Sequence, residues 1–499
     1  MGKAQSIRIG SGDRDHLAVD QSEVAKPLQA LCIHGHFYQP PRENPLTGLI
    51  PLEAGAAPFN NWNERIHSEC YRPNAELGNF ERISFNVGPT LLSWMKLYDA
   101  VTYRRILLQD RSNVERFGVG NAMSQAYHHT ILPLASRMDK ETQVAWGIAD
   151  FEHRFGRKPA GMWLPETGAD TETLEVLAEQ GIEFTILAPW QADTENLDAT
   201  QPYWVSLPSG KRLAVFFYHA GLSAGVSFDQ GMTSNAHDFA LKNVSGHFNG
   251  NGRAHEPQLL LVASDGELYG HHQVFRDWFL AYLVNGAGAR AGVQLTYPAL
   301  WLRQHPPTQE IRIRENTSWS CHHGVARWAG DCGCLLESGH WKKYLRRAFD
   351  NLAEQLDCAY AETMFAFGLE PWKLRNGYIY FLLSETPLAS VVQKASLDQA
   401  ASLGNALSAE SLSTIQMLLK AQFNRQRMYT SCGFFFEDFD RIEPKNSVAY
   451  AVHAIRLTKQ ATGVDLSAGF RFDLSRVASE RSRLRGDQVF DGVMKQIGD

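Results

Sequence analysis

Short apolar segments of strand length alternate with helical patterns from about residue 28 to residue 310. The strand candidates are LQALCIHGH, ERISFNVG, GVGNAM, AGMWLP, EFTILAP, LAVFFYH and QLLLVAS. Helical spacing separates them, as in KETQVAWGIADFEHRFG and TETLEVLAEQG. This alternation is typical of βαβ units and predicts a parallel sheet, either closed as a barrel or doubly wound. In both folds the active site gathers at the carboxyl ends of the strands.

The character of the chain changes after about residue 315. Segments such as KKYLRRAFDNLAEQLDCAYAE and SVAYAVHAIRLTKQ are helical by spacing and propensity. We therefore predict a barrel over residues 28–312 and a mostly helical domain over 313–499. The polar residues 1–27 are predicted to be a disordered tail. A chain of 499 residues is long enough for two or three such units.

Charge and cysteine content exclude several classes of protein. The formal net charge is -6 without strong asymmetry, so no nucleic-acid partner is expected. No apolar run reaches membrane-spanning length, and the polar start lacks the apolar core of a signal peptide. The seven cysteines are scattered, which favours reduced thiols and a cytoplasmic location. The oligomeric state is not indicated.

Carboxylates follow two of the predicted strands directly. Glu166 ends AGMWLPE, where Pro165 stiffens the backbone in front of it. Asp265 and Glu267 lie in SDGELYGHH and would project to the same side if extended backbone continued through them. Neighbouring carboxylates hold one proton more tightly, which favours a general acid. The alternatives are a helix-capping acid for Glu166 and a solvated turn for the other two.

Histidines cluster at the other strand ends. HGHFYQP places His34 and His36 on one face of the first strand, and YHHTILPL carries His128 and His129. Such histidines bind zinc or hydrogen-bond sugar hydroxyls. A metal site needs a third ligand, and nothing in the sequence assembles one. Two long stretches rich in Gly, Asn and Pro, 42–62 and 225–256, are predicted to be loops that cover this rim.

The segment ENTSWSCHHGVARWAGDCGC, residues 315–334, is the densest in chemically active side chains. Its cysteines and histidines are Cys321, His322, His323, Cys332 and Cys334. This spacing is not a standard zinc spacing, so we predict no metal there. The segment is instead interpreted as a loop that closes a cleft with Trp319, Arg327 and Asp331.

In this order the motifs resemble those of glycoside hydrolase family 57, an α-amylase-like family with a (β/α)7 barrel. The family's first motif, similar to H-x-H-Q-P, corresponds to HGHFYQP, which has two more residues before Gln39. Its strand-end motifs similar to WLPE, D-x-E-x-x-G-H and YYHPILPLL correspond to Glu166, Asp265 and His129. The C-terminal part resembles a helical domain of unknown function, DUF3536-like, that accompanies one branch of the family.

The resemblance implies an incomplete (β/α)7 barrel and a retaining glycoside hydrolase or transglycosylase that acts on α-1,4-linked glucans. Glu166 would be the nucleophile and Asp265 the acid/base, with their carboxyl groups about 5 to 5.5 Å apart. No cofactor and no partner other than carbohydrate is expected. The residues predicted to bind substrate are His34, His36, Gln39, His129, Trp163, Glu267, His271, Trp319, Arg327 and Asp331.

Two other functional classes stay open. A metal-dependent carbohydrate deacetylase uses a related incomplete barrel, in which an aspartate and histidines hold the metal. A glycan-binding protein without catalytic activity could keep the same rim. Within the first class, the sequence does not distinguish hydrolysis from transfer or branching.

Overall fold

The computed structural model of the protein describes residues 28–248, 256–334, 339–397 and 407–497, so the predicted tail 1–27 lies outside the described residues. These residues form two sheets, and each predicted strand segment overlaps one of their strands. The strands are β1 (Gln29–Phe37), β2 (Ser84–Val87), β3 (Ala122–Gln125), β4 (Met162–Trp163), β5 (Phe184–Leu187), β6 (Tyr203–Ser206), β7 (Arg212–Phe217), β8 (Gln258–Asp265) and β9 (Gln294–Leu295).

The two sheets together form an incomplete barrel. The larger has the order β4-β3-β2-β1-β8 with all pairs parallel, and β9 pairs with β1; the smaller has the order β5-β7-β6. A parallel bridge between Gly161 and Phe184 joins β4 to β5. The His219 amide donates to the Leu261 carbonyl (2.7 Å), which connects the end of β7 to β8. The parallel strands therefore run β1-β2-β3-β4-β5-β7-β8 around a barrel, as the resemblance implied.

The helices divide into those around the barrel and those of the C-terminal region. Around the barrel lie α1 (Trp62–Ile66), α2 (Arg72–Glu76), α3 (Asn79–Arg82), α4 (Pro89–Tyr98), α5 (Ala100–Phe117), α6 (Arg137–Phe155), α7 (Thr171–Glu179), α8 (Ala220–Phe228), α9 (Ala236–Asp238), α10 (Arg276–Tyr282), α11 (Gly288–Arg290) and α12 (Pro298–Gln304). After them come α13 (Ala326–Ala329), α14 (His340–Ala366), α15 (Pro371–Leu382), α16 (Leu388–Lys394), α17 (Ala409–Arg427), α18 (Cys432–Phe435), α19 (Ile442–Thr462), α20 (Ser467–Leu474) and α21 (Gly486–Ile497).

Strands β1 and β8 are neighbours at one end of the larger sheet and set the position of the site. Both are buried along nearly their whole length, which explains their almost continuous apolar sequences. Their register pairs His36 with Asp265, and the register of β1 with β2 pairs His36 with Asn86. Because all three strands are parallel, these side chains lie together at the carboxyl edge of the barrel.

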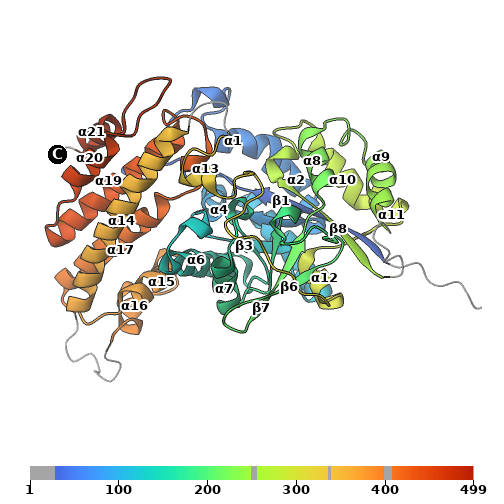
Figure 1. Ribbon diagram of the computed structural model, residues 1–499, viewed down its shortest axis with the longest axis horizontal. Helices are drawn as coiled ribbons and strands as arrows, with labels where there is room; N and C mark the ends of the chain where they lie inside the picture. The colour runs from blue at the N-terminus through green and yellow to red at the C-terminus, as the bar shows by residue number, and fades with distance from the viewer. Residues whose placement is uncertain (1–27, 249–255, 335–338, 398–406, 498–499) are drawn as a thin grey trace, which may run out of the picture.

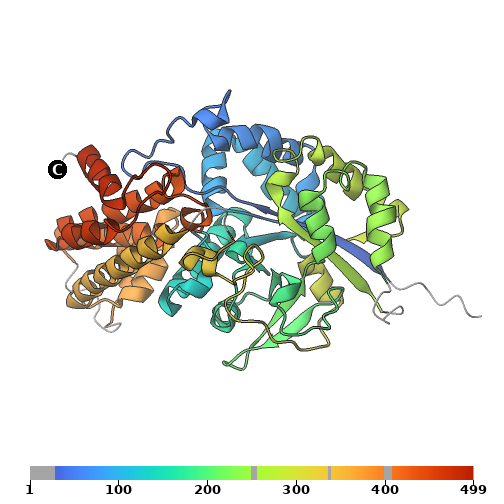
Figure 2. The same cartoon turned by 45° about the horizontal axis from the view of Figure 1, so that its top comes forward.

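Helix α6 links the barrel to the C-terminal helices. The Ser136 side chain accepts a hydrogen bond from the Asp139 amide at its start, and Gly156 ends it with a positive φ of 67°. One face of α6 packs on β3, and Trp146 on its other side shares a core cluster with Tyr360 and Leu374 of the C-terminal region. Figures 1 and 2 show the orange and red helices lying against this side of the barrel.

The predicted loop 225–256 is wrong in part, because much of it is helical. Helix α8 ends at Phe228, and residues 236–247 form α9 followed by two short helical turns. The Asn235 side chain caps this segment, and its apolar residues Phe239, Ala240 and Val244 are buried in the core beside β1. Strands β6 and β9 lay outside the predicted set. The boundary predicted at residue 312 stays a prediction.

The search for membrane spans gives no candidate. Among the described residues, no helix is both long enough and apolar enough to cross a bilayer.

Candidate active site

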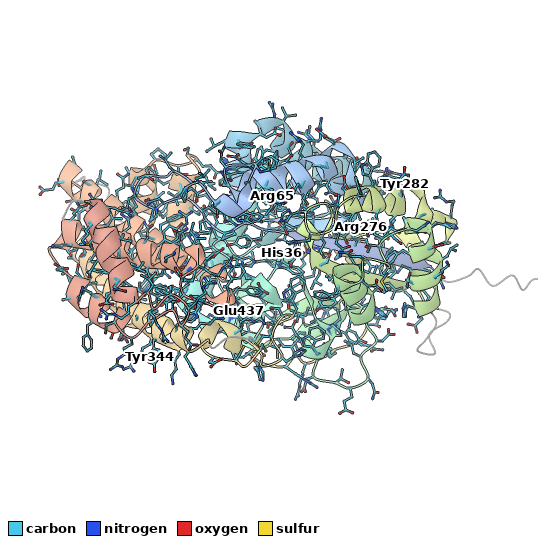
Figure 3. The ribbon with its side chains drawn as sticks, turned by 90° about the horizontal axis from the view of Figure 1, so that it is seen from above. His36, Arg65, Arg276, Tyr282, Tyr344 and Glu437 are labelled. Carbon is cyan, nitrogen blue, oxygen red and sulfur yellow. The ribbon has the colours of Figure 1, made fainter. Side chains whose placement is uncertain are left out.

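Two cavities meet at the carboxyl ends of the strands. The first has a volume of about 420 Å³ and the second about 720 Å³. Residues that line both are Glu166, Asp265, His272 and Phe435. The two carboxylates singled out by the sequence therefore lie where the cavities join. In the view from above, His36 lies near the centre, between Arg65 of α1 and Glu437 of the C-terminal region (Figure 3).

Glu166 is held in an uncommon backbone conformation. It lies three residues after the last residue of β4 and has φ 56° and ψ 22°, in the left-handed region that non-glycine residues seldom adopt. Such strain is retained where the surrounding structure enforces it, and it is frequent at functional sites. Here the enforcing contact is the amide of Trp319, which donates to the Glu166 carbonyl (3.0 Å). The half-buried side chain points to the cavity as a result.

Two hydrogen bonds stabilise the ionised form of the Glu166 carboxyl group. The Trp319 indole N–H and the Ser320 hydroxyl both donate to its Oε2 atom, at 2.9 and 2.7 Å. Burial raises the pKa of Glu166, and these two donors, with the more distant positive charge of Arg327, partly oppose that rise. Among the described residues, no hydrogen-bond donor contacts its Oε1 atom.

Asp265 lies beside other carboxyl groups. It is the last residue of β8, and its side chain is exposed to the cavity while protein surrounds it on the other sides. Burial in this surrounding, and then the charges of Glu267 and Glu166, hold the pKa of Asp265 well above its usual value. A carboxyl group in this state carries a proton near neutral pH and can donate it.

Glu267 has a supporting position and does not form a symmetric pair with Asp265. The extended backbone ends at Asp265 and continues as a single 3-10 turn at Gly266–Leu268, so the predicted alternation does not apply. The Glu267 Oε1 atom accepts hydrogen bonds from the Tyr71 hydroxyl (2.7 Å) and the Tyr38 amide (3.1 Å). Burial raises the pKa of Glu267 to about 7. Its fixed position lets its charge act on Asp265.

His36 and His129 form a neutral pair on the cavity wall. Their Nε2 atoms are 3.1 Å apart, so a single proton occupies the space between them. Burial lowers the pKa of His36 to about 4 and that of His129 well below its usual value. His129 also has a positive φ of 57°, and its Nδ1 is hydrogen-bonded to the Ser431 hydroxyl at 2.6 Å. The two rings therefore add no positive charge to the cavity wall.

Trp163 and His34 lie below the cavity and do not line it. Both side chains are fully buried, and their rings stack at a centroid distance of 4.6 Å. Trp163 also stacks with His36 (5.2 Å), while the His34 Nδ1 is hydrogen-bonded to Ser84 at 2.9 Å. Neither residue lines the two cavities, so the predicted contact of these two residues with a substrate is not supported. Their physical role is to support the ring above them.

The other residues predicted to bind substrate lie in the smaller cavity, in the larger cavity or outside both. Gln39 and His271 line the smaller cavity, and Trp319 and Arg327 line the larger. Asp331 lies outside both cavities; its carboxylate pairs with the His340 imidazole (3.1 Å), so the predicted contact with substrate is not supported. Asp331 lies far along the chain from the strand ends, so the sequence could not show whether its side chain faces a cavity.

Several cavity residues escaped the sequence analysis. Ser320 gave no signal because a lone serine has no diagnostic spacing, although its neighbour Trp319 was singled out. Tyr38 lay inside the HGHFYQP motif and could have been found there. The C-terminal region contributes Ser431, which contacts His129, and Phe435, which lines both cavities. Only the aromatic run GFFFEDFD hinted at the latter.

The polar residues of this rim do not converge as a metal site. Among the described residues, the grouping of three or more potential ligands lies elsewhere, in the 315–334 segment. His36 and His129 already occupy each other's Nε2 atoms, and Asp265 faces two other carboxylates. The arrangement is better suited to acid/base and nucleophilic chemistry by a pair of carboxyl groups.

Comparisons with solved structures identify the fold. An exo-type maltose-forming amylase from Pyrococcus sp. ST04 has a TM-score of 0.70 at 16% identity, covering 94% of this chain and 88% of that one. A GH57-type branching enzyme from Pyrococcus horikoshii has a TM-score of 0.57 at 14% identity, covering 94% of each chain. A 4-alpha-glucanotransferase from Thermococcus litoralis has a TM-score of 0.55 at 15% identity, covering 86% of this chain and 60% of that one.

Sequence comparisons identify the family. Alpha-amylase 1 of Dictyoglomus thermophilum is 25% identical over 162 residues, which is 31% of this chain and only 22% of that protein. Residues 338–497 match a domain of unknown function, DUF3536. Residues 51–314, more than half of the chain, match glycosyl hydrolase family 57. The protein therefore belongs to glycosyl hydrolase family 57 and carries a C-terminal DUF3536 domain, as its motifs had indicated.

Proposed function

We propose that the protein is a retaining glycoside hydrolase or transglycosylase that acts on α-glucans through a glycosyl-enzyme intermediate. The observation that carries this proposal is the pair Glu166 and Asp265 at the junction of two cavities, where burial raises the pKa of both but, of the two, only Glu166 has hydrogen-bond donors that oppose the rise. Two hydrogen-bond donors favour the carboxylate at Glu166, while neighbouring negative charge keeps the proton on Asp265. Pairs of carboxyl groups tuned apart in this way divide the nucleophile and acid roles.

The reaction would proceed in two steps. The Glu166 Oε1 atom attacks the anomeric carbon as Asp265 transfers its proton to the departing glycosidic oxygen, and this leaves a glycosyl ester on Glu166. Asp265, now ionised, then removes a proton from water or from a sugar hydroxyl, which attacks the same carbon and releases Glu166. Two inversions give net retention of configuration. The cavities on either side of the acid pair would hold the two parts of the glucan.

The neighbouring side chains would support these steps. The Trp319 and Ser320 donors keep Glu166 ionised for attack and stabilise it as the leaving group in the second step. The neutral imidazoles of His36 and His129 line the cavity without adding positive charge that would oppose the oxocarbenium-like transition state. The half-buried Trp319 ring offers an apolar face for a sugar. The choice of an α-glucan rests on the activities printed for the related amylase, branching enzyme and glucanotransferase.

Covalent trapping tests the proposal directly. A 5-fluoro-α-glucosyl fluoride should add one glycosyl unit to the wild-type chain, and peptide mass spectrometry should place it on Glu166. Glu166→Gln should abolish the adduct and lower kcat/KM on maltooligosaccharides by at least about 10³-fold. The exposed Glu115 on α5 provides a control, because Glu115→Gln leaves the site untouched.

A second variant identifies the acid/base. Asp265→Asn should lose activity on maltooligosaccharides but keep the first step for an aryl α-glucoside, whose good leaving group needs no proton. Added azide should then restore turnover and give an α-glycosyl azide. An adduct on another residue, or full activity of either carboxyl variant, would refute the assignment. Release of acetate from acetylated sugars without any adduct would favour the deacetylase instead.

The product profile separates the activities within the class. Maltooligosaccharides, amylose, glycogen and galactosides should be supplied in parallel. Shorter linear products indicate hydrolysis, longer linear products indicate transfer, and new α-1,6 linkages indicate branching. Activity on galactosides alone would overturn the α-glucan assignment while leaving the two carboxyl roles intact.

A further inference from the structure

We propose that Cys321, His323, Cys332 and Cys334 bind one zinc ion that holds residues 321–334 in place. One side-chain ligand atom from each residue lies within 4.8 Å of all the others. The four residues come from two short stretches, C-x-H and C-x-C, that the chain brings back to one point. Nothing in the proposed catalysis uses them, and they lie between the segments matched by the two families.

The separations fit a tetrahedral ion. Two sulfur ligands on a tetrahedral zinc with bonds of about 2.3 Å are about 3.8 Å apart. The Sγ atoms of Cys321 and Cys334 are 3.8 Å apart, and the Nδ1 atom of His323 lies 3.2 Å from the Cys334 Sγ atom. The ligand atoms therefore surround a space of the size that zinc needs, with little movement of the backbone.

The surroundings favour a structural site. Cys321 and Cys332 are buried in the C-terminal core with Val325 and Trp328, while Cys334 and His323 are nearer to solvent. Four protein ligands complete the tetrahedron and leave no position for water, which is typical of structural zinc. Three thiolates and one imidazole also favour zinc over magnesium or calcium, which prefer oxygen ligands.

The neighbouring groups also suit bound thiolates. The Cys334 amide donates to the Cys332 Sγ atom at 3.4 Å, a contact that fixes the sulfur and spreads its charge. The buried ammonium group of Lys342 interacts electrostatically with Cys321 and Cys332. A positive charge enclosed here offsets the net negative charge of a zinc with three thiolates. The site is thus supplied with both ligands and a counter-charge.

The site would act on the active centre through the chain. Cys321 directly follows Trp319 and Ser320, which donate to the Glu166 carboxylate. An ion that joins residues 321–323 to residues 332–334 closes a loop directly beside those donors. This loop closure limits the conformations that the segment can adopt and keeps the Trp319 and Ser320 donors within hydrogen-bond distance of Glu166. The zinc would position these residues and take no part in bond breaking, so its test does not depend on the glycosidase assignment.

Metal content is the first measurement. The reduced full-length chain, purified with zinc present and then dialysed free of excess metal, should contain about one zinc per chain by plasma mass spectrometry. The apo-protein titrated with Co²⁺ should show thiolate-to-cobalt charge-transfer bands and the intense visible bands of a tetrahedral site. These two readouts need no variant to fold. Absence of stoichiometric zinc and of the cobalt bands would overturn the proposal, as would bound iron with labile sulfide.

Variants assign the ligands. Cys332→Ser with Cys334→Ser should reduce zinc content at least tenfold, and His323→Ala should weaken zinc retention against a competing chelator. The exposed Cys358 on α14 gives the matched control, and Cys358→Ser should keep the full zinc content. Thiol titration in denaturant with chelator should find all seven cysteines. Two missing thiols, restored by reductant, would show a disulfide in place of the metal and overturn the proposal.

Discussion

At the scale of single residues, the candidate site depends on the hydrogen bonds and charges that surround the carboxyl groups of Glu166 and Asp265. Glu166 accepts two hydrogen bonds at one oxygen, whereas Asp265 faces the carboxylates of Glu267 and Glu166. The first arrangement stabilises charge and the second opposes it. The difference arises from residues far apart in the chain, since the donors Trp319 and Ser320 lie more than 150 positions after Glu166.

Removing one donor should shift the pH profile on its acidic side. Ser320→Ala deletes a hydrogen bond to the Glu166 carboxylate, so the pKa of Glu166 rises. Because Glu166 must be ionised to attack, the acidic limb of kcat/KM should move to higher pH, and activity below the optimum should fall roughly tenfold. The basic limb should keep its position. Equal loss of activity at every pH would contradict this explanation.

Removing the negative charge of Glu267 beside Asp265 should shift the basic limb of the pH profile of kcat/KM. Glu267→Gln keeps the size of the side chain but takes away a negative charge that raises the pKa of Asp265. The pKa of Asp265 then falls, Asp265 loses its proton sooner as pH rises, and the basic limb should move to lower pH. A kcat/KM profile measured on an aryl α-glucoside, which needs less acid assistance, should show a smaller shift and serves as the control.

The Asp265 carboxyl group should also cost stability. Its folded-state pKa is raised above the unfolded value, so any stability that protonation provides is present below the unfolded pKa and lost as pH rises through the folded pKa. Asp265→Asn removes this ionisation and should raise Tm at neutral pH by roughly 2 °C while abolishing glucan hydrolysis. The gain should vanish at acidic pH. A lower Tm at neutral pH would show that Asp265 is structurally required.

At the scale of elements, helix α6 connects the barrel to the C-terminal helices through a buried ionic network. The Asp139 carboxylate pairs with Arg425 at 2.6 Å and with Arg375 at 3.1 Å, and Arg425 pairs in turn with Asp357 at 2.7 Å. Burial opposes ionisation of Asp139, but the two guanidinium groups outweigh it and lower its pKa to about 2. Removing one charged partner from such a network lowers the stability of the fold, because the remaining charges stay buried without that partner.

Neutralising Asp139 should therefore weaken the attachment of α6 to α15 and α17. Asp139→Asn leaves both arginines without their shared partner and should lower the free energy of unfolding by about 3–5 kcal/mol in urea titrations at neutral pH. In the wild type this contribution is present above the unfolded pKa near 4 and is lost as pH falls towards about 2. The exposed Arg471–Asp491 pair gives the control, and Asp491→Asn should change stability by less than about 1 kcal/mol.

At the scale of the whole molecule, the DUF3536 region contributes residues to the candidate active site of the barrel. The Ser431 amide donates to the His129 carbonyl (2.9 Å), and the Tyr38 hydroxyl is hydrogen-bonded to Thr430 (2.9 Å). Phe435 from α18 lines both cavities. Large apolar residues of the two regions also share one core cluster around Trp146. The barrel and the helical region are therefore expected to unfold together.

A chain that ends at residue 334 should test this dependence. It would expose the face of α6 that carries Trp146 and Asp139, and it would lose the contacts to His129 and Tyr38. We expect it to aggregate or to show no cooperative thermal transition, whereas the full chain should give one calorimetric peak for both regions. Two well-separated peaks in the full chain, or a stable and active truncated chain, would show that the regions are independent.

The strands and their terminal acids were readable from sequence because they depend on local pattern. Apolar runs predicted β1 and β8, and parallel pairing then requires their carboxyl ends to meet, which placed Glu166, Asp265, His36 and His129 on one rim. The helical segment at 236–247 was missed because its Gly- and Asn-rich flanks are typical of loops. Its apolar residues become informative only once they are seen packed beside β1.

The sequence by itself indicated a parallel α/β fold, the helical C-terminal region and the candidate acids at the strand ends, because strand period, helix period and short motifs are properties of neighbouring residues. Only the tertiary structure decided that Asp265 faces the cavity while Glu267 is buried, and that Trp163 lies beneath His36. It alone brought Cys321 and His323 against Cys332 and Cys334. Contacts between distant residues depend on the path of the chain in space, which spacing along the sequence does not contain.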